Sequence, residues 1–204
     1  MERKKEKQKK FLTMRSSVKT LAIKCYEEQM PLGWEDVQKR IRSYPKSELQ
    51  ILGICHNRDP KTDDVWAPSM EKPHYHIIVR IVAPPFEKSN PMCVSTILNI
   101  LGIVYRPDKD EDLWKEHGVE SCWDYSEYAV YLTHETKKAV MDGKTRYEIE
   151  EFVSNLTLEE IKQVRDGYMR LSETNGKVCV STMAKLDQNA YELGQNLGDF
   201  DKWY

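Results

Sequence analysis

The chain has 204 residues, of which 40% are hydrophobic and 31% charged, so it is long enough to bury a sizeable core and has an ordinary globular composition. No apolar run approaches the roughly 20 residues that a membrane-spanning helix needs, which argues against an integral membrane protein. The basic N-terminus is not followed by the apolar segment of a secretory signal, so we expect a cytoplasmic protein with no membrane partner.

The net charge of −2 hides an uneven distribution along the chain. Residues 1–24 carry nine lysines and arginines against two acids, whereas residues 108–127 are strongly acidic. A basic arm over residues 1–16 can contact DNA phosphates, and a solvated tail explains the same composition equally well.

The cysteine content argues against a disulfide-stabilised or zinc-stabilised protein. The number of cysteines is odd, they are widely spaced, and no two of them form a CxxC pair. We interpret them as reduced residues in apolar surroundings. They are Cys25, Cys55, Cys93, Cys122 and Cys179.

Strand and helix patterns alternate along the first part of the chain. Residues 18–26 have the pattern of a strand, and residues 31–43 carry apolar side chains on one face at helical spacing. Two further strands are predicted over residues 48–56 and 73–82, with a polar loop between them.

A second helix, a loop and a fourth strand are predicted next. The helix extends from Asn90 to Gly102, with Asn90 as its cap and Pro91 at its first position. Residues 107–117 are acidic and are interpreted as a surface loop, and residues 119–123 as a strand.

Helices dominate the remainder of the chain. Asp124 is predicted to cap a helix over residues 125–135. Thr157 and Glu160 form a capping box at the start of a helix that extends to about Leu171. A short element is predicted over residues 146–153, and a final helix over residues 181–197.

This order of elements predicts an α+β fold with a mainly antiparallel sheet flanked by helices. The main domain is expected over residues 17–142, with a small helix-rich C-terminal extension over residues 143–204. Because the second and third strands are joined by a loop, they are expected to pair as antiparallel neighbours, which would bring His56 beside the third strand.

Histidines gather at the ends of these two strands. His74 and His76 lie two residues apart in a strand and therefore project from the same face. His56 ends the preceding strand, and Asp59 follows three residues later. Three imidazoles and a carboxylate suit a divalent cation such as Mn²⁺, Mg²⁺, Co²⁺ or Zn²⁺ with open coordination positions. The alternative left open is that the histidines are buried, hydrogen-bonded strand residues.

Two longer motifs give these histidines a family context. The run Lys72-Pro73-His74-Tyr75-His76-Ile77-Ile78 and the run Tyr128-Ala129-Val130-Tyr131-Leu132-Thr133-His134-Glu135, preceded by His56-Asn57-Arg58-Asp59, resemble the HUH endonucleases. The likeness is greatest to the RepB-type initiators of rolling-circle plasmid replication and covers residues 18 to about 155 in order and spacing. It implies an HUH domain that holds one Mn²⁺ or Mg²⁺ through His56, Asp59, His74 and His76.

The resemblance also implies the reaction. Tyr131 would attack a phosphodiester of single-stranded origin DNA, leaving a 5′-phosphotyrosine and a free 3′-hydroxyl that primes synthesis. Tyr128, three residues earlier on the same helix face, is the alternative nucleophile. Packing is the alternative role for both tyrosines together with Tyr125, and His134 is expected to pack or to hydrogen-bond nearby.

The implied partners are origin DNA, single-stranded at the nick and duplex nearby, and a host helicase and polymerase in a bacterial cytoplasm. The chain has no GxxxxGK[ST] loop and hence no helicase of its own. Arg58, Lys61 and Lys72, with Trp66, are the predicted DNA contacts, and the alternative is that this charged loop is only solvated. The last fifty or so residues carry no resemblance, so the oligomeric state stays open. A mobilisation relaxase, a single-strand transposase and a non-catalytic DNA-binding regulator remain as alternatives.

Overall fold

The computed structural model describes residues 12–61, 70–82, 91–105, 113, 118–122 and 124–174. Most of the predicted basic arm, most of the acidic loop, Trp66, Cys179 and the final predicted helix lie outside this part of the chain. Two compact units are present, one formed by residues 1–56, 73–123 and 153–156, the other by residues 57–72, 124–152 and 157–204. The predicted domain boundaries near residues 16 and 142 stay predictions.

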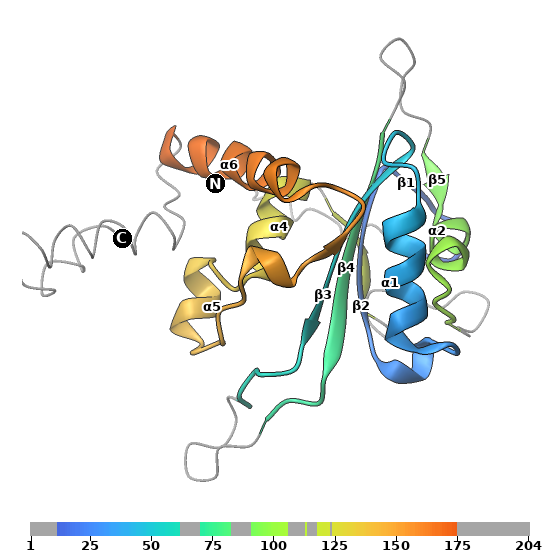
Figure 1. Ribbon diagram of the computed structural model, residues 1–204, viewed down its shortest axis with the longest axis horizontal. Helices are drawn as coiled ribbons and strands as arrows, with labels where there is room; N and C mark the ends of the chain where they lie inside the picture. Colours follow the sequence, from blue (N-terminus) through green and yellow to red (C-terminus); the bar gives the residue numbers. More distant parts are fainter. Residues whose placement is uncertain are drawn as a thin grey trace, which may run out of the picture. The chain divides into compact units, whose positions relative to one another are not determined.

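A five-stranded antiparallel sheet forms the centre of the first unit (Figure 1). Its strands follow the order β6-β2-β4-β3-β7, and β1 pairs separately with β5. Together with the helices, this sheet confirms the predicted α+β class. The strands are β1 (Ser17–Val18), β2 (Thr20–Cys25), β3 (Leu49–His56), β4 (His74–Ile81), β5 (Met92–Cys93), β6 (Val119–Ser121) and β7 (Val153–Ser154).

The two strands that carry the histidines pair as the sequence predicted. β3 and β4 are antiparallel neighbours, and their register puts His56 directly opposite His74 and Ile54 opposite His76. Since side chains alternate along a strand, Ile77 and Val79 leave the other face of the sheet. The register therefore separates an apolar face from a face with histidines at its end.

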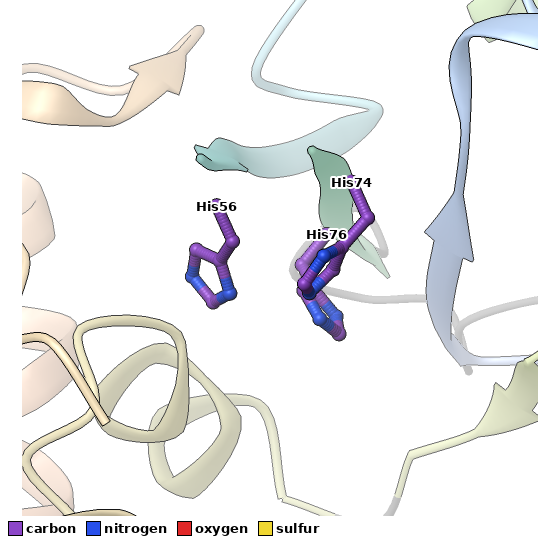
Figure 2. Close-up of side chains that lie close together, drawn as sticks. All are labelled: His56, His74 and His76. Atoms are coloured by element: carbon purple, nitrogen blue, oxygen red, sulfur yellow. The ribbon is translucent and has the colours of Figure 1, made fainter. Parts of the chain in front are cut away.

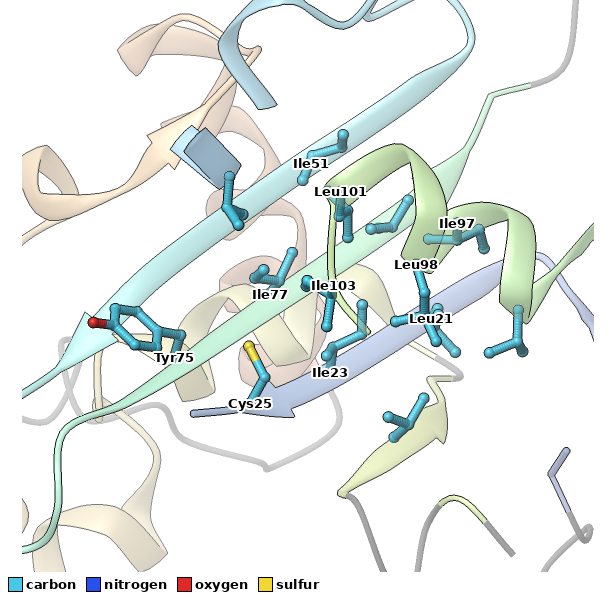
Figure 3. Close-up of a cluster of buried hydrophobic side chains, with 14 of the residues drawn as sticks. Leu21, Ile23, Cys25, Ile51, Tyr75, Ile77, Ile97, Leu98, Leu101 and Ile103 are labelled. Atoms are coloured by element: carbon cyan, nitrogen blue, oxygen red, sulfur yellow. The ribbon is translucent and has the colours of Figure 1, made fainter. Parts of the chain in front are cut away.

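The apolar face of the sheet carries the core of the first unit, shown in Figure 3. Two helices cover it, α1 (Gly33–Ser43) and α2 (Val94–Leu101), whose buried side chains include Val37 and Ile41 on α1 and Ile97 on α2. Burying each such side chain contributes about 1.5–3 kcal/mol. Before β3, η1 (Glu27–Gln29) leads from β2 into α1.

Gly53 lets α1 lie close against the sheet. A Cβ atom at this position would lie 3.1 Å from Trp34 Cη2 and 3.2 Å from Ile41 Cδ1. A larger residue in the middle of β3 would therefore need the helix side chains to shift.

The predicted start of α2 is wrong. The helix begins at Val94 and not at Asn90, and its N-cap Cys93 has an extended backbone. Met92 and Cys93 instead pair with Val18 and Ser17 of β1, a contact far along the chain that local capping signals do not reveal. The predicted end is confirmed, because Gly102 adopts a left-handed conformation with a φ of 73°.

Helices make up most of the second unit. α4 (Tyr125–Leu132) packs against α6 (Leu158–Thr174), and the capping residue Asp124 accepts hydrogen bonds from the Ser126 and Glu127 amides as predicted. The sequence did not predict α5 (Lys137–Met141) as a separate helix, and it indicated only an undefined element where η2 (Ile149–Glu151) lies.

The ends of α4 and α6 complete this comparison. α4 ends at Leu132, three residues before the predicted end, because His134 has a φ of 57° that a right-handed helix cannot continue. The capping box of α6 is confirmed by hydrogen bonds between Thr157 and Glu160 in both directions. Within the described ranges, no helix has both the length and the apolar character needed to cross a membrane.

Candidate metal site and candidate nucleophile

Three imidazoles meet on the first unit at the end of β3 and β4 (Figure 2). The ring centroids lie 5.4 Å apart for His56 and His74, 4.8 Å for His56 and His76, and 5.1 Å for His74 and His76. One nitrogen of each ring lies within 4.8 Å of the other two. Metal–nitrogen bonds of about 2.0–2.1 Å place two nitrogens of one ion about 3–3.4 Å apart, so the three rings could bind one ion after moving closer together.

Strand geometry explains why these three side chains converge. His74 and His76 alternate with Tyr75, whose ring belongs to the apolar core, and His56 lies across the ladder from His74. All three imidazoles are buried, with exposed fractions of 1%, 3% and 5% for His56, His74 and His76. A buried cluster of imidazoles can bind a metal ion, and the three predicted histidine ligands lie together.

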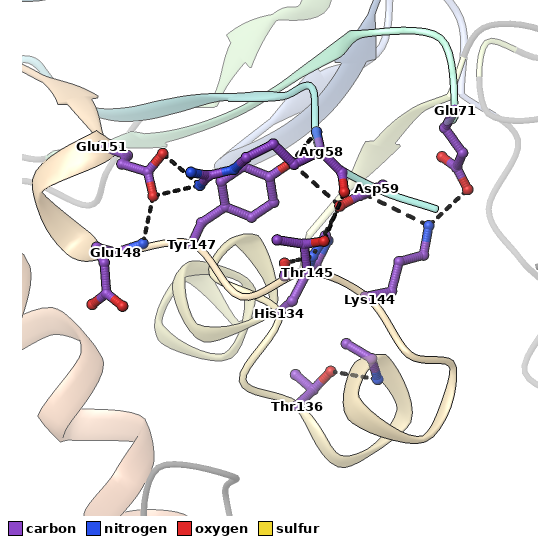
Figure 4. Close-up of polar contacts among 11 residues, drawn as sticks. Arg58, Asp59, Glu71, His134, Thr136, Lys144, Thr145, Tyr147, Glu148 and Glu151 are labelled. Carbon is purple, nitrogen blue, oxygen red and sulfur yellow. Dashed lines mark hydrogen bonds and ion pairs between the residues drawn. The ribbon is translucent and has the colours of Figure 1, made fainter. Parts of the chain in front are cut away.

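Asp59, the fourth predicted ligand, belongs to the second unit, where it is buried in a polar network (Figure 4). The Tyr147 hydroxyl donates to Asp59 Oδ1 at 3.3 Å, and Lys144 Nζ lies 3.7 Å from Oδ2. A buried carboxylate needs such partners to remain charged. Whether Asp59 shares an ion with the histidines stays a prediction.

His134 also belongs to the network around Asp59. A packing or hydrogen-bonding role was predicted for this residue, and its contacts agree with that role. Its Nδ1 atom lies 2.7 Å from the Thr145 carbonyl oxygen and 3.5 Å from Asp59 Oδ1. Because a carbonyl only accepts, Nδ1 carries the proton and Nε2 keeps its lone pair. Burial lowers the pKa of His134 below its usual value, although the Thr145 carbonyl and the Asp59 charge oppose this.

Lys144 supplies the positive charge of the network. Its Nζ atom donates to Glu71 Oε1 at 2.8 Å. Burial lowers the pKa of Lys144, but the hydrogen bond to Glu71 and the charges of Glu71 and Asp59 outweigh burial and raise it overall. Sequence reasoning missed Lys144, Glu71 and Tyr147 as partners of Asp59, since none lies at a motif spacing from it.

Tyr131 is accessible on the surface of α4. Its side chain is 39% exposed, whereas Tyr125 on the same helix is 4% exposed. The Tyr131 ring lies 5.2 Å from that of Tyr128 and 6.3 Å from that of His134. Packing therefore explains Tyr125. The partly exposed side chain of Tyr131 is accessible to a substrate.

A buried carboxylate fixes the chain just after this tyrosine. Glu135 is 1% exposed and accepts hydrogen bonds from Thr133 Oγ1 at 2.7 Å and Arg146 Nη2 at 2.8 Å, and it pairs with Arg165 on α6. Charge-assisted contacts of this kind are stronger than neutral hydrogen bonds. The cluster holds the end of α4 against α6, and no local sequence pattern predicted it because Arg165 lies on a different helix.

The predicted DNA contacts Arg58, Lys61 and Lys72 are all exposed. Arg58 donates to both carboxylate oxygens of Glu151 at 2.8 and 2.7 Å and lies 4.5 Å from the centre of the Tyr147 ring. The hydrogen bond to Glu151 raises the pKa of Arg58. DNA would have to compete with Glu151 for this guanidinium, and the three contacts stay predictions.

The chain was compared with protein-family models and with curated proteins. No protein-family model matches the chain, and no curated protein matches it. The likeness to the HUH endonucleases rests on the sequence motifs and stays a prediction.

Proposed function

We propose that the protein is a metal-dependent, site-specific DNA nickase and strand transferase of the HUH type that initiates rolling-circle replication of a plasmid. The proposal includes an HUH fold for the antiparallel sheet and a bacterial cytoplasm as its location. The observation that carries it is the convergence of His56, His74 and His76 within 4.8 Å in a buried cluster.

The donor set supports a catalytic divalent ion. His56, His74 and His76 would hold it, with Asp59 as the fourth ligand, and the remaining positions would be open to a phosphate oxygen. Imidazole is a better ligand for Mn²⁺ than for Mg²⁺, which prefers oxygen, so we favour Mn²⁺. When bound, such an ion supplies Lewis acidity to the phosphoryl group.

Tyr131 is the proposed nucleophile. Its phenolic oxygen forms a bond to phosphorus while the bond to the 3′-oxygen breaks, and the phenolic proton is lost as the 3′-hydroxyl is generated. The resulting 5′-phosphotyrosine conserves the energy of the phosphodiester for rejoining. An exposed fraction of 39% for Tyr131 supports this role.

The position of the tyrosine motif favours an initiator over the alternatives of the same chemistry. Among the proteins that this chain resembles, relaxases commonly carry the catalytic tyrosine near their N-terminus. In this chain, Tyr131 instead follows the histidine motif at residues 74–76. A mobilisation relaxase therefore fits less well, and a single-strand transposase of the same chemistry remains the alternative.

The decisive experiment detects the covalent intermediate. The protein is incubated with Mn²⁺ and a pool of random single-stranded oligonucleotides labelled at the 3′ end, then separated under denaturing conditions. We expect labelled protein, because cleavage attaches the 5′-phosphate of the labelled fragment to the enzyme.

Matched variants locate the nucleophile. Tyr131→Phe should abolish the labelled adduct, Tyr128→Phe should retain it, and a chelator should abolish it. Absence of adduct from the parent protein, together with tight binding of duplex DNA, would instead support a non-catalytic regulator.

A further inference from the structure

Two side chains, Lys24 of β2 and Tyr26 directly after this strand, extend the face on which the histidines lie. Lys24 is opposite His76 in the ladder between β2 and β4, and Tyr26 directly follows Cys25, which is opposite Tyr75. Residues two apart on a strand project from the same face, so Lys24 and Tyr26 share the face of His74 and His76.

The contacts of Tyr26 agree with this placement. Its ring centroid lies 6.1 Å from that of His74, with an interplanar angle of 50°, and Lys24 Nζ lies 5.7 Å from the Tyr26 ring centroid. Both side chains are half-buried, so part of each remains accessible. An aromatic ring and an ammonium group thus lie beside the three imidazoles.

The backbone beneath these side chains is firmly held. The Tyr26 amide donates to Gln29 Oε1 at 2.6 Å, and the Lys24 amide donates to the Gly118 carbonyl at 3.0 Å. The Tyr105 hydroxyl donates to the Lys24 carbonyl at 2.8 Å. A fixed backbone lowers the entropy lost when a ligand is bound.

Gly118 leaves room for the lysine side chain. A Cβ atom at this position would lie 3.1 Å from Lys24 Cβ, and Gly118 has a φ of 65° that favours glycine. The lysine stem can therefore lie flat over the neighbouring chain.

Charge indicates the kind of ligand that this face accepts. The imidazoles of His56, His74 and His76 bring no negative charge to a divalent ion, so even with the Asp59 carboxylate as fourth ligand the site would keep a net positive charge, and Lys24 adds another positive charge on the same face. The bound ion and the Lys24 ammonium group repel each other. An anion that lies near both charges would relieve this repulsion. An aromatic ring beside an anion site suits a nucleotide, which joins a phosphate to a stacking base.

We propose that Lys24 and Tyr26 form a nucleotide subsite beside the metal site. Tyr26 stacks on a base of single-stranded DNA, and Lys24 contacts the backbone phosphate next to that base. The inference rests on the proposed function, since it names the residues that hold the strand for cleavage.

The test measures binding without cleavage. All variants are made in a Tyr131→Phe background, and anisotropy of a fluorescein-labelled oligothymidine is followed with Mn²⁺ at increasing salt. Tyr26→Leu should weaken binding about tenfold with an unchanged salt dependence, because stacking involves no counterion release. Tyr26→Phe should retain the affinity.

Lys24→Gln has a different expected signature. It should reduce the slope of log K against log salt by about 0.7, the effect of one phosphate contact on a single strand. Lys39→Gln is the matched control, because Lys39 is exposed on α1, which covers the apolar face of the sheet. It should leave the slope unchanged, and thermal unfolding of each variant verifies folding.

The outcomes separate this inference from the proposed function. Parent affinity in Tyr26→Leu, or an unchanged slope in Lys24→Gln, would overturn the subsite. If the labelled adduct still forms with intact Tyr131, the nickase survives that result. If the unmodified protein forms no adduct but Tyr26 and Lys24 act as expected in binding, the nickase is wrong and the binding face remains.

Discussion

Mn²⁺ should stabilise the folded protein, and His76→Ala should abolish that stabilisation. His76 is the test position because its ring is the nearest to each of the other two, at 4.8 Å from His56 and 5.1 Å from His74. At an ion concentration one hundred times Kd, binding contributes about 2.7 kcal/mol. For a chain of this length, that raises Tm by about 5–11 °C.

Differential scanning fluorimetry across a Mn²⁺ titration measures the shift. His76→Ala leaves only two imidazoles, whose centroids lie 5.4 Å apart, so the shift should disappear. Ile97→Val is the control: it removes one buried methyl group from α2, lowers the metal-free stability by about 0.5–1.5 kcal/mol and should keep the full Mn²⁺ shift. An equal shift in the parent and in His76→Ala would refute the three-histidine site.

Three further predictions concern buried ionisable groups. Glu135→Gln should lower the free energy of unfolding in urea by about 2–4 kcal/mol, because Arg165 loses its buried charged partner; a change within error would contradict this. Burial raises the pKa of the Cys25 thiol to about 12, so iodoacetamide at mildly alkaline pH should label Cys25 only after denaturation, as read by mass spectrometry. Because burial lowers the pKa of His134, the unfolded chain binds a proton that the folded chain does not. His134 should therefore lower the free energy of unfolding by at most about 1.4 kcal/mol per pH unit as pH drops below about 6.5, and urea titrations should show a fall that is weaker by this amount in His134→Asn.

The strand pairing behind the metal site was predictable because its signals are local. An apolar run ending in His56 and another beginning at His74 are separated by a polar loop, which favours antiparallel neighbours. Alternation then determines which side chains share a face. These two rules predict that His56 lies beside the histidine strand, whereas the exact register, with His56 opposite His74, is determined by the pairing along all of β3 and β4.

The surroundings of Asp59 and Glu135 could not be predicted in the same way. Asp59 meets Tyr147, which lies 88 residues away, and Glu135 meets Arg165 on another helix. Periodicity and capping describe only residues within a turn or two of each other, so they carry no information on such pairs. The exposure of Tyr131 could not be predicted either, because tyrosines on one helix face have the same spacing whether they pack against the protein or face solvent.

The register of β4 against its neighbours determines which side chains lie on each face of the sheet. Ile77 and Val79 are fully buried on the apolar face, and the residues between and before them, including His76, must then leave the opposite face. A slip of one residue would place the imidazoles among the apolar side chains under α1 and α2 and would move Ile77 and Val79 to the opposite face, which is strongly unfavourable. The energy that packs α1 and α2 on the sheet thus also fixes the histidines, so the arrangement of the candidate metal ligands is as stable as the core of the first unit.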